Sequence, residues 1–114
     1  MDRKGIGETC LALPGASLDH PFGDDQDVYK VGGKMFAMVG DEGALSFNVS
    51  DIAYEVLTEA GRARPAPYLA RAKWVNLPDP DAWPAEELAN HLAAAHAIIA
   101  AKLTRKARTE LGLG

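Results

Sequence analysis

Apolar and polar residues alternate most clearly between residues 27 and 49, where the sequence reads DVYKVGGKMFAMVGDEGALSFNV. Alternation with a period of two predicts β-strands. Gly32-Gly33 predicts a two-residue hairpin, because glycine tolerates the positive φ that a type I′ turn needs. A second turn at residues 40–43 predicts a third strand. This stretch is therefore predicted to form a meander of three antiparallel strands.

The hairpin implies a register, because the turn length decides which residues oppose each other. The expected opposed pairs are Val31 with Lys34, Tyr29 with Phe36, Asp27 with Met38, Met38 with Leu45, and Phe36 with Phe47. One face of the sheet then becomes the predicted core face, which collects Tyr29, Val31, Phe36, Met38, Leu45, Phe47 and Val49. The other face collects Lys30, Ser46 and Asn48, with Val28, Met35, Ala37 and Val39 among them.

The segments before and after the meander have apolar residues at helical spacing. Residues 2–13 predict a first helix that ends at Pro14-Gly15, with Ile6, Cys10 and Leu13 on one face. A second short helix is expected to begin at Ser50 or Asp51 and to end at Gly61, with an apolar stripe of Ile52, Val56, Leu57 and Ala60. The last helix is predicted from Pro84 to about residues 102–104, with an apolar face of Leu88, Leu92, Ala95, Ile99 and Leu103.

The remaining segments complete the expected architecture. Residues 14–26 are predicted to be a loop, and residues 74–77 a last strand beside a proline-containing edge strand. Residues 105–114 are either a frayed extension or a basic tail. The order predicts one α+β domain over residues 1–114. It is a two-layer sandwich in which the N- and C-terminal helices pack on one face of an antiparallel sheet of about five strands.

Composition narrows the class of protein. The chain has 114 residues, 47% of them hydrophobic and 25% charged, with a net charge of −4, as in ordinary globular proteins. No apolar run reaches the roughly 18 residues of a membrane span, and residues 1–10 lack the apolar middle of a signal peptide. The single Cys10 cannot form an internal disulfide, so these features together favour the cytoplasm.

The residues that could carry catalysis or bind a metal do not form a recognised motif. His91 and His96 are five residues apart and would point about 140° away from each other on a helix. Cys10 lies on an apolar helix face, where a thiol is usually inert. His20 among Asp19, Asp24 and Asp25 could bind a divalent ion, but the spacing fits a solvated turn better. We therefore expect neither an enzyme nor a cofactor.

Basic residues are segregated in the sequence, and residues 61–78 contain no acidic side chain. Basic side chains on protruding hairpins can follow a phosphate backbone, and aromatic side chains can stack or wedge. The candidates for nucleic-acid contact are Lys30, Lys34, Arg62, Arg64, Arg71 and Lys73, with Tyr68 and Trp74 interleaved. The alternative is that these charges form a solvated face and that the two aromatic residues are packing residues.

Five short motifs in order resemble the MmcQ/YjbR family. They are CLALPG at residues 10–15, HPFGD at residues 20–24, YKVGGKMF at residues 29–36, APYL at residues 66–69 and KWV at residues 73–75. The resemblance implies a CyaY/frataxin-like α+β sandwich. It also implies DNA binding through a double wing of β-hairpins, which would be the hairpin at Gly32-Gly33 and the region from residue 62 to residue 74.

These observations lead to two functional hypotheses. The first is a DNA-binding protein without catalysis that contacts DNA through its basic hairpins. The second is a protein- or metal-interaction module that uses the acidic loop at residues 19–27, by analogy with frataxin-like folds. In either case we expect no membrane association and a monomer or weak dimer.

Overall fold

The structure, a computed structural model, describes residues 1–113 of the chain. Its sheet has six strands, and every pair of neighbours is antiparallel. In spatial order they are β1 (Ala16–Asp19), β2 (Asp27–Val31), β3 (Lys34–Val39), β4 (Leu45–Asn48), β6 (Trp74–Leu77) and β5 (Arg64–Pro65). The helices are α1 (Arg3–Leu11), α2 (Asp51–Glu59), α3 (Ala85–Ala100) and α4 (Arg105–Glu110). Two short 3₁₀ turns, η1 (Ala70–Ala72) and η2 (Pro80–Ala82), flank β6.

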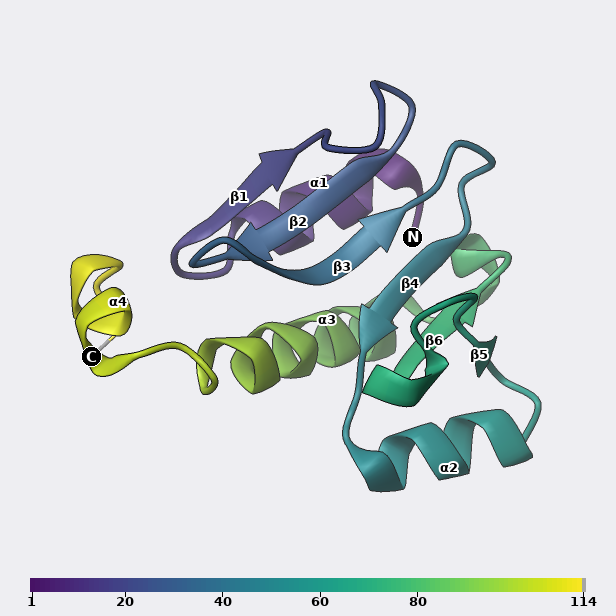
Figure 1. The fold of residues 1–114 in the computed structure, drawn as a ribbon. Coiled ribbons are helices and arrows are strands. Elements are labelled where there is room, and N and C mark those ends of the chain that lie inside the picture. The colour runs from purple at the N-terminus through teal and green to yellow at the C-terminus, as the bar shows by residue number, and fades with distance from the viewer. Residues whose placement is uncertain (114) are drawn as a thin grey trace.

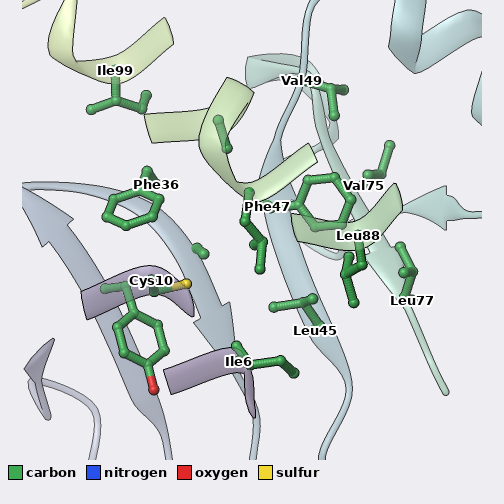
Figure 2. Packing of buried hydrophobic residues seen from close by; sticks show 14 of the residues in the cluster. Ile6, Cys10, Phe36, Leu45, Phe47, Val49, Val75, Leu77, Leu88 and Ile99 are labelled. Carbon is green, nitrogen blue, oxygen red and sulfur yellow. The ribbon is translucent and has the colours of Figure 1, made fainter. Parts of the chain in front are cut away.

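The core lies between the sheet and the helices α1 and α3, which pack against each other on one side of the sheet (Figure 1). Figure 2 shows how the two helices and the inner strands interdigitate, with Ile6 and Cys10 from α1 and Leu88 and Ile99 from α3. The strands β3, β4 and β6 contribute Phe36, Phe47 and Val75, among others. This arrangement confirms the predicted α+β two-layer sandwich, with six strands in place of about five.

The predicted hairpin at Gly32-Gly33 is present, but the predicted register is wrong beyond the first pairs. Val31 opposes Lys34 as expected, whereas Tyr29 opposes Ala37 and a β-bulge leaves Phe36 without a partner. The bulge shifts the remaining β2–β3 pairs by one residue, so that Val28 opposes Met38 and Asp27 opposes Val39. The β3–β4 pairs also differ from the expected ones by one residue, with Val39 opposite Leu45 and Ala37 opposite Phe47. Because side chains alternate along a strand, Ala37 and Val39 are buried on the core face and Met38 moves to the other face.

The strand β1 was predicted to be part of a loop. Its sequence, ASLD, has weak strand propensity, and the strand exists because it pairs with β2, with Ala16 opposite Val31 and Asp19 opposite Val28. This pairing extends the sheet beyond the meander and makes β1 an edge strand.

Local signals at the ends of α2 are confirmed, but its predicted apolar stripe is only partly correct. The Ser50 hydroxyl accepts a hydrogen bond from the Ala53 amide at the N-terminus. At the C-terminus Gly61 has φ of +70°, and the amide of Arg62 bonds back to the Leu57 carbonyl in a Schellman arrangement. Leu57 is buried with Ala53 and Tyr54 packed beside it, whereas Ile52 and Val56 are exposed.

The C-terminal segment forms a capped helix, α4, where a frayed extension or a basic tail was expected. The Thr104 hydroxyl accepts a hydrogen bond from the Ala107 amide, and Leu111 packs against Gly15 and the edge of the core. Residue 114, the last of the predicted tail, lies outside the described residues. Within the described part of the chain, no helix combines the length and the apolar character needed to cross a membrane.

Candidate nucleic-acid interface

The six basic candidates lie in two groups on opposite halves of the sheet. Lys30 and Lys34 belong to the β2–β3 hairpin, and the other four surround the β5–β6 hairpin, which residues 66–73 connect. Strands β2 and β5 are four steps apart in the sheet, which corresponds to roughly 19 Å at the usual strand spacing. The structure therefore does not bring the six side chains into one patch, but it does place each group on a hairpin.

In the first hairpin only Lys34 keeps an ammonium group available to a ligand. The Nζ of Lys30 donates to Asp19 Oδ2 at 2.8 Å, and the Lys30 side chain is only 21% exposed. This ion pair joins the edge strand β1 to β2, so its role is structural. Lys34 is exposed at the first position of β3, directly after the turn, and no acidic partner is found for it among residues 1–113.

Beside the second hairpin, the guanidinium of Arg62 is already paired with a carboxylate of the protein. Its guanidinium donates two hydrogen bonds to the Glu87 carboxylate, at 2.6 and 3.0 Å, and lies 4.3 Å from the centre of the Trp83 ring. The hydrogen bond from Arg62 lowers the pKa of Glu87. Arg62 therefore connects the end of α2 to the start of α3. The sequence carried no sign of this pair, because the two residues are 25 positions apart.

Arg64 is positioned by a row of polar residues on the face of the sheet opposite α1 and α3. Arg64 opposes Asn76, and Asn76 opposes Ser46 on the adjacent strand. Arg64 Nε donates to Asn76 Oδ1 at 2.8 Å, and Asn76 Nδ2 donates to Ser46 Oγ at 2.9 Å. The Nε contact orients the guanidinium, while no carboxylate among the described residues neutralises it. Sequence reasoning missed Asn76 and Ser46 because their alignment depends on the sheet register.

The connection between β5 and β6 is a short ordered loop, residues 66–73, that presents Tyr68 and Arg71. The Ala66 amide bonds to the Trp74 carbonyl, and the Trp74 amide to the Leu69 carbonyl. Asn48 Nδ2 donates to the Ala72 carbonyl at 2.9 Å, which fastens the loop to β4. Trp74 is buried, which bears out its alternative reading as a packing residue.

Within this loop two residues other than glycine have positive φ. Tyr68 has φ of +66° and its side chain is fully exposed, and Lys73 has φ of +63°. An L residue with a side chain loses about 1–2 kcal/mol in this left-handed conformation. Lys73 regains part of that energy because its Nζ lies 4.8 Å from the centre of the Tyr54 ring. Arg71 is exposed in η1, and residues 1–113 contain no ion-pair partner for it.

The acidic loop is tied to the rest of the fold through Asp27. Asp27 accepts hydrogen bonds from Arg3 Nε at 2.8 Å and from His20 Nε2 at 2.9 Å. The hydrogen bond from Arg3, and to a smaller degree that from His20, lowers the pKa of Asp27. Arg3 also donates to the carbonyls of Asp25 and Gly40. Within residues 1–113, no group of three or more His, Cys, Asp or Glu side chains is placed to hold a metal ion.

The other candidates for chemistry are packing residues. Burial raises the pKa of the Cys10 thiol to about 12. His96 is buried edge-on against Phe36, and its Nε2 donates to the Pro14 carbonyl at 2.7 Å. His91 lies between the rings of Phe47 and Trp83, and burial lowers its pKa.

Together these features define a class of small α+β protein. Its antiparallel sheet is covered on one face by α1 and α3, and each half of the sheet carries a hairpin with basic residues. The model of the YjbR family matches residues 11–98, which is most of the chain. The chain therefore belongs to the YjbR family, as the resemblance of its motifs implied.

A solved structure supports the same assignment. The chain resembles the crystal structure of the Deinococcus radiodurans protein DR2400, which has a DUF419 domain, with a TM-score of 0.82 and 29% sequence identity. The match covers 96% of this chain and 86% of the DR2400 chain. No curated protein matches the sequence.

Proposed function

We propose that this protein is a DNA-binding protein without catalytic activity, and that its β5–β6 hairpin is the main contact with DNA. The observation that carries the proposal is the charge of this hairpin. Residues 61–78 include four basic residues and no acidic ones, and Arg64 and Arg71 are not engaged by a carboxylate within the described part of the chain. Phosphate contacts need such available cations, and a positive surface can exist on a net-acidic protein.

The β2–β3 hairpin provides a second, weaker contact in this proposal. Lys34 is its exposed cation, while Lys30 is held by Asp19. On the other half, Arg62 is held by Glu87 and Lys73 lies over Tyr54. Of the six sequence candidates, we therefore assign DNA contact to Lys34, Arg64 and Arg71, and a structural role to Lys30, Arg62 and, in part, Lys73.

The absence of catalysis is proposed from what the reactive side chains do in the fold. The thiol of Cys10 is buried with a pKa of about 12, so it is not a nucleophile at neutral pH. The imidazole of His96 is held by the Pro14 carbonyl. We also propose a cytoplasmic location, because a reducing compartment suits a single free thiol.

The alternative function, an acidic interaction surface, has fewer carboxylates available for a partner than the sequence suggested. Two of its four aspartates are engaged within the protein, Asp19 by Lys30 and Asp27 by Arg3. Only Asp24 and Asp25 have no ion-pair partner among residues 1–113, and both are exposed at the loop. We therefore place this function second.

Fluorescence anisotropy with labelled duplex and single-stranded DNA at several salt concentrations tests the proposal. Binding should weaken with salt, because each phosphate contact releases a counterion. Replacing both Arg64 and Arg71 by glutamate should weaken binding and reduce the slope of log affinity against log salt by about two. The proposal is wrong if the wild-type protein binds neither DNA at low salt, or if this variant keeps the wild-type affinity and slope.

A matched control separates local contact from overall charge. Lys4→Glu on α1 changes the net charge by the same amount as Arg71→Glu, at a side chain that is 85% exposed. We expect Lys4→Glu to bind DNA nearly as the wild type does and Arg71→Glu to bind clearly more weakly. Equal losses in the two variants would indicate a general charge effect and would count against the hairpin as the site.

A further inference from the structure

Tyr68 combines two features that an ordinary loop residue lacks. Its ring is completely exposed, and it is the most exposed of the large hydrophobic side chains in the described part of the chain. Its backbone has φ of +66°, a conformation that favours glycine. Because the ring is exposed, it makes no packing contacts that would compensate for this unfavourable conformation. Unfavourable backbone geometry that the fold maintains without local compensation is often associated with a binding site.

Hydrogen bonds hold the backbone of this loop in place. Hydrogen bonds from Ala66 to Trp74 and from Trp74 to Leu69 close the loop on both sides of Tyr68. The side-chain Nδ2 of Asn48 donates to the Ala72 carbonyl and anchors the loop to β4. Pro67 directly before Tyr68 further restricts the backbone. The backbone that carries the ring is therefore preorganised, so little backbone entropy would be lost when a ligand stacks on the ring.

Charge near the ring indicates the kind of ligand. Arg71, three residues after Tyr68, is exposed, and the loop and its flanking strands carry no acidic side chain. Arg64 lies on the β5 arm of the same hairpin and is oriented by Asn76. A flat aromatic ring beside cations that can bind phosphates is how proteins hold single strands of nucleic acid, because each base offers a face for stacking.

We propose that Tyr68 stacks on an unpaired base of DNA while Arg71 and Arg64 contact the adjacent phosphates, so that this hairpin prefers single-stranded to double-stranded DNA. In a duplex the faces of the bases are covered by their neighbours, so the ring gains a partner only at unpaired positions. This inference rests on the proposed DNA-binding function and adds the form of DNA that the hairpin recognises.

Three variants at position 68 separate stacking from folding. Tyr68→Phe keeps the ring, and Tyr68→Ala removes it while retaining the unfavourable φ. Tyr68→Gly removes the ring and relieves the backbone, so it should unfold at the wild-type temperature or above. Phe22→Ala is the matched control, because it removes another exposed aromatic ring, which lies in the loop before β2.

The measurement uses a single-stranded oligonucleotide with one 2-aminopurine, whose fluorescence is quenched when an aromatic ring stacks on it. Wild type, Tyr68→Phe and Phe22→Ala should quench it and bind with similar affinity. Tyr68→Gly and Tyr68→Ala should lose the quenching and bind the single strand about tenfold more weakly. Their affinity for a blunt duplex should change less than about twofold, since there the phosphate contacts are retained.

The outcomes distinguish the inference from the function on which it rests. If the wild type binds DNA in a salt-dependent way but Tyr68→Gly binds and quenches like the wild type, the stacking role is wrong and the proposed function stands. If the wild type binds neither form of DNA at low salt, both are wrong. If Tyr68→Gly loses duplex and single-strand affinity equally, the preference for unpaired bases is wrong.

Discussion

The side chain of Leu103 occupies the space that a Cβ on Gly32 would need, since its Cδ1 lies 2.6 Å from that position. Gly32 is the first residue of the β2–β3 turn, and Leu103 follows α3. Gly32 also has φ of +58°. The same glycine therefore forms the turn and lets the segment that follows α3 pack closely against the hairpin. Because this hairpin carries Lys34, the contact also fixes the position of that cation.

Gly32→Ala should destabilise the protein for both reasons. The left-handed backbone costs about 1–2 kcal/mol, and the clash with Leu103 adds about 1–3 kcal/mol of overpacking. Gly33→Ala is a matched control, because Gly33 has φ of +79° but no atom within 4 Å of its Cβ position. Gly33→Ala should therefore lose only the free energy of placing an alanine in the left-handed conformation. Urea denaturation of the two variants measures the difference, and equal free energies of unfolding would show that Leu103 moves aside without cost.

Asp27→Asn should lower stability at neutral pH and have little effect in acid. The pKa of Asp27 is lowered in the folded state by Arg3 and His20, so its contribution is complete above the unfolded pKa of about 3.9. This stabilisation is lost as the pH falls through the lower pKa that Asp27 has in the folded state. We expect a loss of about 1 kcal/mol at pH 7, since Arg3 is partly exposed. Denaturation curves at pH 7 and pH 2 measure it, with the exposed Asp24→Asn as control. A loss that is equal at both pH values would contradict the ion pair as its source.

Cys10 should not react with thiol reagents in the folded protein. Its side chain is fully buried in α1 and the pKa of its thiol is about 12, so almost no thiolate forms at pH 8. A thiol-reactive dye at pH 8 should label it rapidly in 6 M guanidinium (about the usual denaturing concentration) and only at the rate of unfolding in buffer. Fast labelling without denaturant would mean that α1 opens readily.

Arg62 and Arg71 should contribute differently to DNA binding, although the sequence identified both as candidates for nucleic-acid contact. Arg62→Gln removes the pairing with Glu87 and the contact with Trp83, neither of which involves Arg64 or Arg71. It should therefore leave the salt dependence of DNA binding close to that of the wild type. Arg71→Gln should reduce the salt slope by about one. Anisotropy titrations of the two variants over the same salt series measure this. Equal reductions would mean that Arg62 leaves Glu87 to bind phosphate.

Features that depend on neighbours in the chain were predictable. The turn at Gly32-Gly33, the cap at Ser50 and the end of α2 at Gly61 all appear where the sequence placed them. The apolar face of α3 is likewise buried along its whole length. Each of these signals involves residues no more than a few positions apart, so the backbone preferences and spacing that produce them are visible in the sequence.

The candidate site was predictable as a set of basic residues but not as an arrangement. The sequence identified the hairpin and its cations. It could not show that Lys30 and Arg62 are held by Asp19 and Glu87, because those partners lie 11 and 25 positions away. Whether a surface cation is available to a ligand depends on which acidic group the fold brings within about 3 Å of it.

The sequence by itself determined the layers of this protein, its turns and the helices that cover its core. Only the tertiary structure decided the register of β2 against β3, through the bulge at Phe36, and the existence of β1. It also decided that Tyr68 is exposed in a left-handed conformation while Trp74 is buried. The physical reason is that strand pairing and burial are settled by contacts between distant segments, whose energies outweigh local preferences of the chain.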